Sequence, residues 1–194
     1  MQGKLTFTSK QITGIAVVFS LVIVLQAVGG TVSIGPVQLN FTLIPIVLGA
    51  IIFGPIVGAF LGFISGVIVL NQVIMGAVPF YTLIWTNDPV TTVFTCLLKT
   101  TVAGYLSGLV YNMLKEKKAV LAVFVASAIV PVVNTALFIL GCLCMTNSVY
   151  AMANGTNVIV FILVSLVTFN FFIELAINLI LAPTLHKVLK YIKI

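Results

Sequence analysis

The sequence has few charged residues and no arginine. Only 6% of its 194 residues are charged, namely nine lysines and three acidic residues. A soluble domain carries about 25% charged residues, so a chain this poor in charge cannot face water on all sides. Because 61% of the residues are hydrophobic, we expect lipid to cover most of the surface, as in an integral membrane protein.

Residue types that carry catalysis or bind metals are also scarce. His186 is the single histidine, and neither H-E-x-x-H nor the phosphate-binding G-x-x-x-x-G-K-[ST] motif occurs. The three cysteines, Cys96, Cys142 and Cys144, lie in apolar stretches and predict small buried residues without a disulfide framework. We therefore expect no enzymatic activity, no metal site and no cofactor.

Long apolar runs occupy most of the chain and predict an all-α membrane protein. Residues 41–73 would form a helix of about 50 Å, too long for one crossing, and Gly54-Pro55 marks a turn that divides them. No small-residue cleavage site follows an apolar run of the usual length, so the first span is read as a retained helix. The chain is one predicted domain, 1–194, with six spans at 11–28, 41–54, 55–73, 89–113, 119–145 and 157–185.

The positions of the lysines predict the topology. With six spans, the lysines before the first span, between the fourth and fifth, and after the last all fall on one side. The positive-inside rule places that side, and both termini, in the cytoplasm. Topology thus explains the net charge of +6, which does not indicate a nucleic-acid partner. These lysines are Lys4, Lys10, Lys115, Lys117, Lys118, Lys187, Lys190 and Lys193.

Two of the outer connections have distinctive sequences. The first alternates apolar residues around Gly35-Pro36, which indicates a β-hairpin rather than a simple linker. The second is rich in aromatic residues and ends at Asp88-Pro89, which is typical of an N-cap and a first-turn proline. The connections predicted outside are 29–40, 74–88 and 146–156.

Small residues recur at four-residue spacing on three predicted helices. Such stripes let a neighbouring backbone approach closely, so we expect tight packing inside the bundle, with docking of another subunit as the alternative. Ala16 and Ser20 form a further pair of this kind on the first helix. The glycines in these stripes are Gly54, Gly58, Gly62 and Gly66, and then Gly104 and Gly108.

Polar residues inside the spans are the strongest functional signal. Lys99, Asn134 and Asn170 lie at comparable depth on three helices, and Glu174 follows Asn170 by four residues on the same helix face. A charged side chain in a bilayer is costly, so Lys99 should face the interior and have a partner. Two partners remain open: Glu174 or Asn134 in a structural network, or a bound anion such as a substrate carboxylate.

Side chains of the outer connections could close over the same site. The aromatic residues of 74–88, Tyr81 and Trp85 among them, belong either to an interfacial belt or to a lid over a ligand. Gln38 and Asn40 could offer hydrogen bonds to that ligand. The candidate substrate-binding residues are therefore Lys99, Asn134, Asn170, Glu174, Trp85, Tyr81, Gln38 and Asn40.

The whole chain resembles the substrate-binding S component of energy-coupling factor (ECF) vitamin transporters. The run LIPIVLGAIIFGPIVGAFLG at 43–62 is typical of that family, as are the length and the six-span layout. The family docks its transmembrane T component through an A-x-x-x-A motif on the first helix. Ala16-x-x-x-Ser20 matches that position, with serine in place of the second alanine, so the resemblance implies that this pair is a partner interface.

Later segments resemble a branch of the family labelled as pantothenate carriers. These segments are DPVTTVFTCLLKTTVAG at 88–104, PVVNT at 131–135 and FNFFIELAIN at 169–178. In the family, the ligand lies in the outer half of the bundle, under two outer loops and against the last three helices. The resemblance implies the same place for a ligand here, next to Lys99, Asn134 and Asn170. An anionic acid such as pantothenate fits one lysine in a polar pocket.

These observations lead to one hypothesis and two rivals. The hypothesis is a binding subunit without catalytic activity in a bacterial cell membrane, which takes a small water-soluble vitamin from outside. The resemblance implies that it works with a T component and two ABC-type ATPases. The first rival is a self-sufficient carrier or channel that uses Glu174 and Lys99 as a relay. The second is a membrane scaffold in which those two residues form a structural pair.

Overall fold

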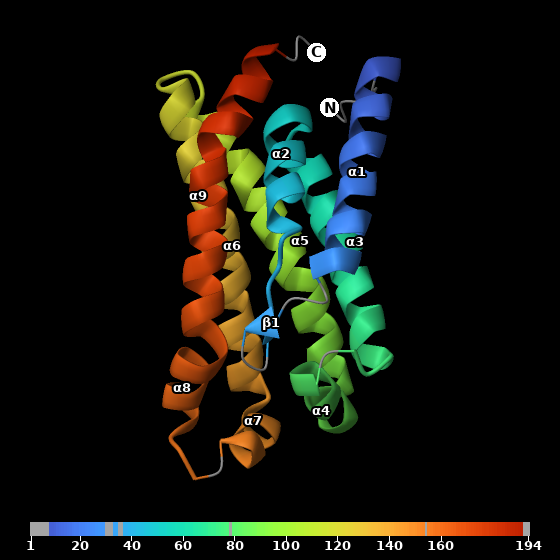
Figure 1. The fold of residues 1–194 in the computed structure, drawn as a ribbon, viewed down its shortest axis with the longest axis vertical. Coiled ribbons are helices and arrows are strands. Elements are labelled where there is room, and N and C mark those ends of the chain that lie inside the picture. The colour runs from blue at the N-terminus through green and yellow to red at the C-terminus, as the bar shows by residue number, and fades with distance from the viewer. Residues whose placement is uncertain (1–7, 30–32, 35–36, 78, 154, 192–194) are drawn as a thin grey trace, which may run out of the picture.

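The fold is a bundle of helices that lie roughly along one direction (Figure 1). The computed structural model describes residues 8–29, 33–34, 37–77, 79–153 and 155–191, so Lys4 and Lys193 lie outside the described residues. In that part of the chain, five helices are long and apolar enough to cross a membrane. They are α1 (Ser9–Gly29), α3 (Pro55–Ile74), α5 (Pro89–Leu114), α6 (Ala119–Cys144) and the continuous helix Val158–Tyr191.

The predicted span 41–54 is shorter than expected. Its helix, α2 (Leu43–Phe53), has 11 residues and is about 17 Å long at 1.5 Å per residue, too short to cross a bilayer alone. Figure 1 shows α2 in one half of the bundle, with the preceding extended segment continuing the crossing into the other half. The crossing at the predicted span 41–54 therefore combines a short helix with extended backbone that is buried among the helices.

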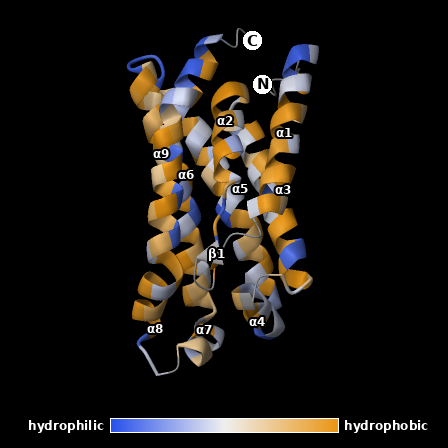
Figure 2. Ribbon diagram, viewed as in Figure 1, coloured by the Kyte–Doolittle hydropathy of each residue, from blue (hydrophilic) through white to orange (hydrophobic). Residues whose placement is uncertain are grey.

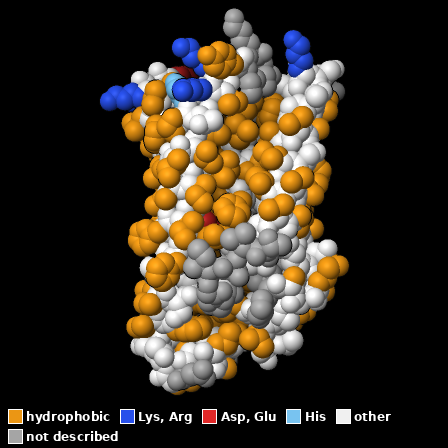
Figure 3. Space-filling model, in the orientation of Figure 1, with side chains coloured by type: hydrophobic (Ala, Val, Ile, Leu, Met, Phe, Trp, Pro, Cys, Tyr) orange, Lys and Arg blue, Asp and Glu red, His pale blue; other side chains and the backbone are white. Residues whose placement is uncertain are grey.

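The ends of the bundle agree with the predicted topology. Ser9 begins α1, and Tyr191 ends α9 (Thr168–Tyr191), the last part of the continuous helix; both lie at the same end of the bundle (Figure 1). Figure 2 shows hydrophilic residues gathered at that end and mainly hydrophobic residues along the helices. Described lysines project from the same end (Figure 3). By the positive-inside rule, this end faces the cytoplasm.

The connections on the other side contain regular structure. Strands β1 (Ser33–Ile34) and β2 (Val37–Gln38) pair in antiparallel fashion, with Ile34 opposite Val37, which confirms the predicted hairpin. Its expected turn residues, Gly35 and Pro36, lie outside the described residues. Short helices α4 (Pro79–Asn87) and α7 (Thr146–Met152) occur where only loops were predicted. Helices satisfy their own backbone hydrogen bonds, which favours them near lipid.

The predicted N-cap and first-turn proline at Asp88-Pro89 are confirmed, although the Asp88 side chain has a different partner from a usual cap. Asp88 does occupy the N-cap position of α5, and Pro89 is its first helical residue, but the Asp88 side chain makes no capping hydrogen bond. Its carboxylate instead accepts a hydrogen bond from the Ser148 hydroxyl of α7. The side chain thus joins two outer connections that are 60 residues apart in the sequence.

The glycine stripes pack α3 directly against α5. A Cβ atom on Gly62 would overlap the carbonyl oxygen of Thr100, and one on Gly66 would lie 2.6 Å from that of Cys96. The Thr100 hydroxyl donates to the Gly62 carbonyl oxygen at 2.7 Å across the same seam. Internal packing is therefore the role of these stripes. Gly54 differs, because its φ of +100° lets the chain turn between α2 and α3.

The cysteines are free thiols, but they are not all buried as expected. Cys142 is buried and Cys144 is exposed. Positions two residues apart on a helix are rotated by about 200°, so the Cys142 side chain points into the bundle and that of Cys144 points toward lipid. Cys96 on α5 is buried.

Candidate functional site

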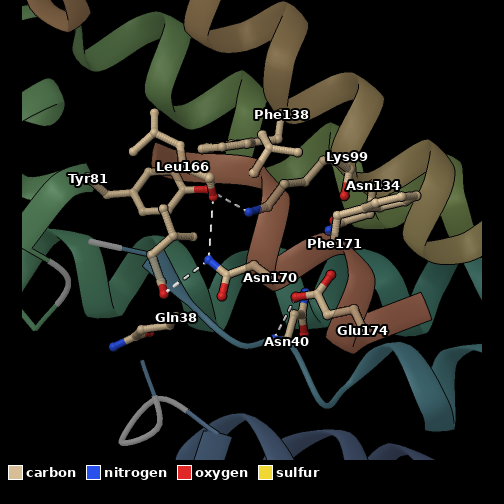
Figure 4. A pocket seen from close by; sticks show the side chains of 13 residues that line it. Gln38, Asn40, Tyr81, Lys99, Asn134, Phe138, Leu166, Asn170, Phe171 and Glu174 are labelled. Atoms are coloured by element: carbon tan, nitrogen blue, oxygen red, sulfur yellow. Dashed lines mark hydrogen bonds between the residues drawn. The ribbon is translucent and has the colours of Figure 1, made fainter. Parts of the chain in front are cut away.

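A cavity lies in the outer half of the bundle, beneath the hairpin and α4. It encloses about 350 Å³ of space free of protein atoms, including its opening. Figure 4 shows its side chains converging from the hairpin, α4, α5, α6 and the last helix. The lining consists of Val37, Gln38, Asn40, Tyr81, Lys99, Asn134, Thr135, Phe138, Leu166, Val167, Asn170, Phe171 and Glu174.

Lys99 on α5 supplies a buried positive charge to this cavity. Its side chain is 7% exposed, and its Nζ donates a hydrogen bond of 2.8 Å to the Tyr81 hydroxyl. The ammonium also lies 4.9 Å from the centre of the Tyr81 ring and 5.5 Å from that of Phe138. Such cation–π contacts stabilise a desolvated ammonium. Glu174 and Asn134 were the structural partners expected for Lys99. Within the described residues, neither of them accepts a hydrogen bond from its ammonium.

Tyr81 is part of the wall and does not belong to an interfacial belt. It is 3% exposed and packs with Phe80 and Phe138, at ring-centroid distances of 5.5 and 5.8 Å. Burial raises the pKa of its phenol well above the ordinary value of 10.0. The phenol is therefore protonated at neutral pH. Its oxygen can accept from Lys99 while its proton remains for a ligand.

Glu174 and Asn170 on α9 hold the hairpin against the last helix. A Glu174 oxygen accepts a hydrogen bond of 2.9 Å from the backbone N–H of Asn40. The Asn170 side-chain amide donates to the carbonyl oxygen of Val37 at 3.3 Å. The two residues are one helical turn apart, as their four-residue spacing predicted. Together they hold the segment 37–40 over the cavity.

The helix that carries these residues is not regular. A π-helical segment, η1 (Phe161–Val167), follows α8 (Val158–Val160) and precedes α9 (Thr168–Tyr191). It ends three residues before Asn170, and its Leu166 and Val167 line the cavity. A π-helical turn shifts the face that later residues present and often occurs at functional sites. The apolar sequence of this segment has no proline or glycine to signal the irregularity.

Asn134 on α6 presents an unused hydrogen-bond acceptor. It is 6% exposed, lines the cavity, and its Oδ1 is without a hydrogen-bond partner among the described residues. A buried polar atom in that state costs free energy unless a ligand or water supplies a donor. The cavity thus combines an ammonium donor at Lys99 with acceptors at Asn134 and Glu174.

The other predicted site residues divide into two groups. Gln38 lines the cavity beside Asn40, and its side-chain amide donates to the Ala77 carbonyl oxygen at 3.4 Å. Trp85 lies outside the lining and packs against the apolar cluster around Phe80 and Phe138. Ala16 and Ser20 are not among the residues that line the cavity and lie on the exposed face of α1.

Sequence reasoning missed the apolar part of the lining. Phe138 lies four residues after Asn134, and Leu166 lies four residues before Asn170. Both therefore share a helix face with a predicted polar residue, which is the signal that could have identified them. The described residues contain no group of three or more His, Cys, Asp or Glu side chains that could hold a metal ion. What the cavity offers a ligand is hydrogen bonds, charge and aromatic faces.

Comparison with known families identifies the chain. The family model described as "ECF transporter, substrate-specific component" matches residues 10–186, which include all the residues that line the cavity and nearly all of the long helices. No individual curated protein matches the sequence. The match agrees with the multi-pass helical fold, and such components bind the transported substrate beside partner transmembrane and ATPase components. The chain therefore belongs to the family of substrate-specific components of ECF transporters, and it is a binding subunit rather than an enzyme.

Proposed function

We propose that this subunit binds a small, water-soluble vitamin with a carboxylate group from the outside, with pantothenate as the best candidate. The observation that carries the proposal is Lys99. Its ammonium is buried in a cavity wall, and among the described residues its hydrogen bond goes to a neutral phenol rather than to a carboxylate. A charge in that position is best compensated by an anionic ligand.

The other polar groups favour a ligand with hydrogen-bond donors away from its carboxylate. Asn134 Oδ1 is buried without a donor among the described residues, and Glu174 offers acceptor oxygens on the same cavity. Pantothenate has hydroxyl and amide groups in addition to its carboxylate, so it can satisfy both kinds of partner. In this proposal the carboxylate contacts Lys99 and Tyr81, and the hydroxyl groups contact Asn134 and Glu174.

The subunit would then deliver its ligand to a T component driven by two ABC-type ATPases. Ala16 and Ser20 on the exposed face of α1 are the proposed contact with the T component. Small residues on a lipid-facing surface let a partner helix approach closely.

A thermal-shift screen of the purified subunit tests this function. The panel contains pantothenate, riboflavin, thiamine, biotin, folate and pyridoxine. A ligand present at one hundred times its dissociation constant adds about 2.7 kcal/mol to the free energy of unfolding, which is readily measured. A single strong response to pantothenate, lost in Lys99→Met, supports the proposal. No response to any vitamin in folded protein contradicts it, and substrate uptake by the subunit alone in liposomes would favour a self-sufficient carrier.

A further inference from the structure

A buried hydrogen-bonded cluster connects α1 to the edge of the cavity. It consists of Gln26 on α1, Thr42 just before α2, and Ser65 on α3, which are 4%, 0% and 0% exposed. The Ser65 hydroxyl donates to the Gln26 side-chain oxygen at 3.1 Å and lies 2.8 Å from the Thr42 hydroxyl. Three elements thus meet through polar groups at a depth where apolar side chains would avoid the cost of desolvation.

The cluster holds Asn40, which Glu174 holds from the opposite side. The Thr42 hydroxyl donates to the side-chain oxygen of Asn40, while the backbone N–H of Asn40 donates to Glu174 at 2.9 Å. Asn40 is therefore the residue through which a cavity carboxylate and the α1–α3 side of the bundle are joined. Its position depends on hydrogen bonds at both ends.

Two further observations place the cluster beside the site. A second hollow of about 320 Å³, including its opening, is lined by Gln26 and Asn40 together with Tyr81 and Lys99. Gln26 is itself fixed by Gln72. Its side-chain amide donates to the Gln72 side-chain oxygen at 3.4 Å, and its backbone carbonyl oxygen accepts from the Gln72 side-chain amide at 3.4 Å. The cluster therefore borders the site and has a defined geometry.

We propose that Gln26, Thr42 and Ser65 are positioning residues for substrate binding. They orient Asn40 so that its N–H stays on Glu174, and the carboxylate then presents its remaining oxygen to the substrate in one geometry. Satisfied polar networks in a low-dielectric interior specify a unique arrangement, and loss of one hydroxyl leaves Asn40 free to shift. This inference rests on the proposed function for the identity of the ligand alone.

Removal of single hydroxyl groups tests the proposal. Thr42→Val and Ser65→Ala should each weaken pantothenate binding about three- to tenfold, the range that one hydrogen bond contributes. Ser107→Ala is the matched control, because Ser107 is also 0% exposed and donates a single hydrogen bond, to the Ala126 carbonyl oxygen at 3.0 Å. This control should lose thermal stability and keep its affinity. Thr42→Ser retains the hydroxyl and should bind as the wild type does.

Hydrogen–deuterium exchange of the segment 37–42 gives a readout that needs no ligand. It should be faster in Thr42→Val and Ser65→Ala than in the wild type, and unchanged in Ser107→Ala. Unchanged exchange in the first two variants would overturn the proposal, as would wild-type affinity accompanied by a loss of stability. If the wild type binds no vitamin, the proposed function fails, while exchange still decides whether the cluster positions Asn40.

Discussion

The ammonium of Lys99 lies 2.8 Å from the hydroxyl of Tyr81, although the two residues belong to different helices. Tyr81 comes from α4, a short helix of an outer connection, and Lys99 comes from the membrane-spanning α5. The contact therefore joins an outer connection to a charge inside the bundle. Among the described residues, this hydrogen bond goes to a phenol and not to a carboxylate, which is the basis for the proposed anionic ligand.

Replacement of Lys99 separates a ligand-binding role from a structural one. Lys99→Met removes a buried charge that is paired with a neutral phenol, so the ligand-free protein should unfold at the same temperature or a higher one. Affinity for a carboxylate ligand should fall about ten- to a hundredfold, since hydrogen bonds to charged groups contribute about 1.5–3 kcal/mol. Thermal unfolding with and without pantothenate measures both effects. Lys10→Met, at the cytoplasmic end, should change neither, and a large loss of stability in Lys99→Met would favour the scaffold rival.

The buried phenol of Tyr81 predicts a loss of stability at alkaline pH. Burial raises the pKa of Tyr81 in the folded protein above the ordinary value of 10.0, and α4 lies outside the membrane-spanning helices. The unfolded chain therefore releases this proton above about pH 10 while the folded protein keeps it. This contribution to stability is complete below about pH 9 and is lost as the pH rises above 10.

Tyr81→Phe removes that proton, so its free energy of unfolding should fall less steeply above pH 10. Denaturant unfolding at a series of alkaline pH values measures the difference. Tyr150→Phe serves as the control, because Tyr150 is 60% exposed. Parallel curves for wild type and Tyr81→Phe would contradict the prediction.

The close contact of α3 with α5 predicts that Gly62 tolerates no side chain. A Cβ at this position would meet the backbone of Thr100, and backbone cannot move aside as a flexible side chain can. Gly62→Ala should lower the free energy of unfolding by about 1–3 kcal/mol, as overpacking does in other cores. Val67→Leu, on the exposed face of the same helix, should have little effect in the same unfolding assay. If Gly62→Ala were as stable as Val67→Leu, α3 and α5 would be able to move apart and the prediction would be wrong.

The hydrogen bond between Ser148 and Asp88 predicts coupling of two outer connections. Ser148→Ala leaves the Asp88 carboxylate without this donor and should cost about 1–3 kcal/mol, as expected for a hydrogen bond to a charged group. Asp88→Asn and the double variant complete a double-mutant cycle. Additive losses in the cycle would show that the two side chains do not interact.

The exposed small residues of α1 predict an effect on transport without an effect on binding. Ala16→Trp and Ser20→Trp should leave vitamin affinity of the isolated subunit unchanged, because neither residue lines the cavity. Assembly with the T component and uptake should both fall, because a large side chain keeps the helices apart. Phe172→Trp, at a 60% exposed position of α9, is the control. Normal assembly of both α1 variants would show that this face of α1 is not the contact with the T component.

Much of the fold follows from the sequence because the bilayer imposes strong constraints on it. Hydrocarbon cannot hydrogen-bond to the backbone, so long apolar runs become helices, and the lysines orient them. A shared interior could also be predicted for Lys99, Asn134, Asn170 and Glu174. Polar side chains are costly in lipid, so they face the interior of the bundle and pair there. The spacing of the glycines indicated the stripes that pack α3 on α5.

Tertiary structure decided which partners these residues have. No local pattern indicates that Lys99 meets Tyr81, that Glu174 meets the backbone of Asn40, or that η1 interrupts the last helix. Each of these features depends on contacts between segments far apart in the sequence, and helix periodicity carries no information about them. The short α2 belongs with them, because its extended approach is tolerated only where other helices bury it. The sequence by itself determined a membrane bundle with a polar interior, and only the packing of its helices and hairpin decided how that interior forms a cavity.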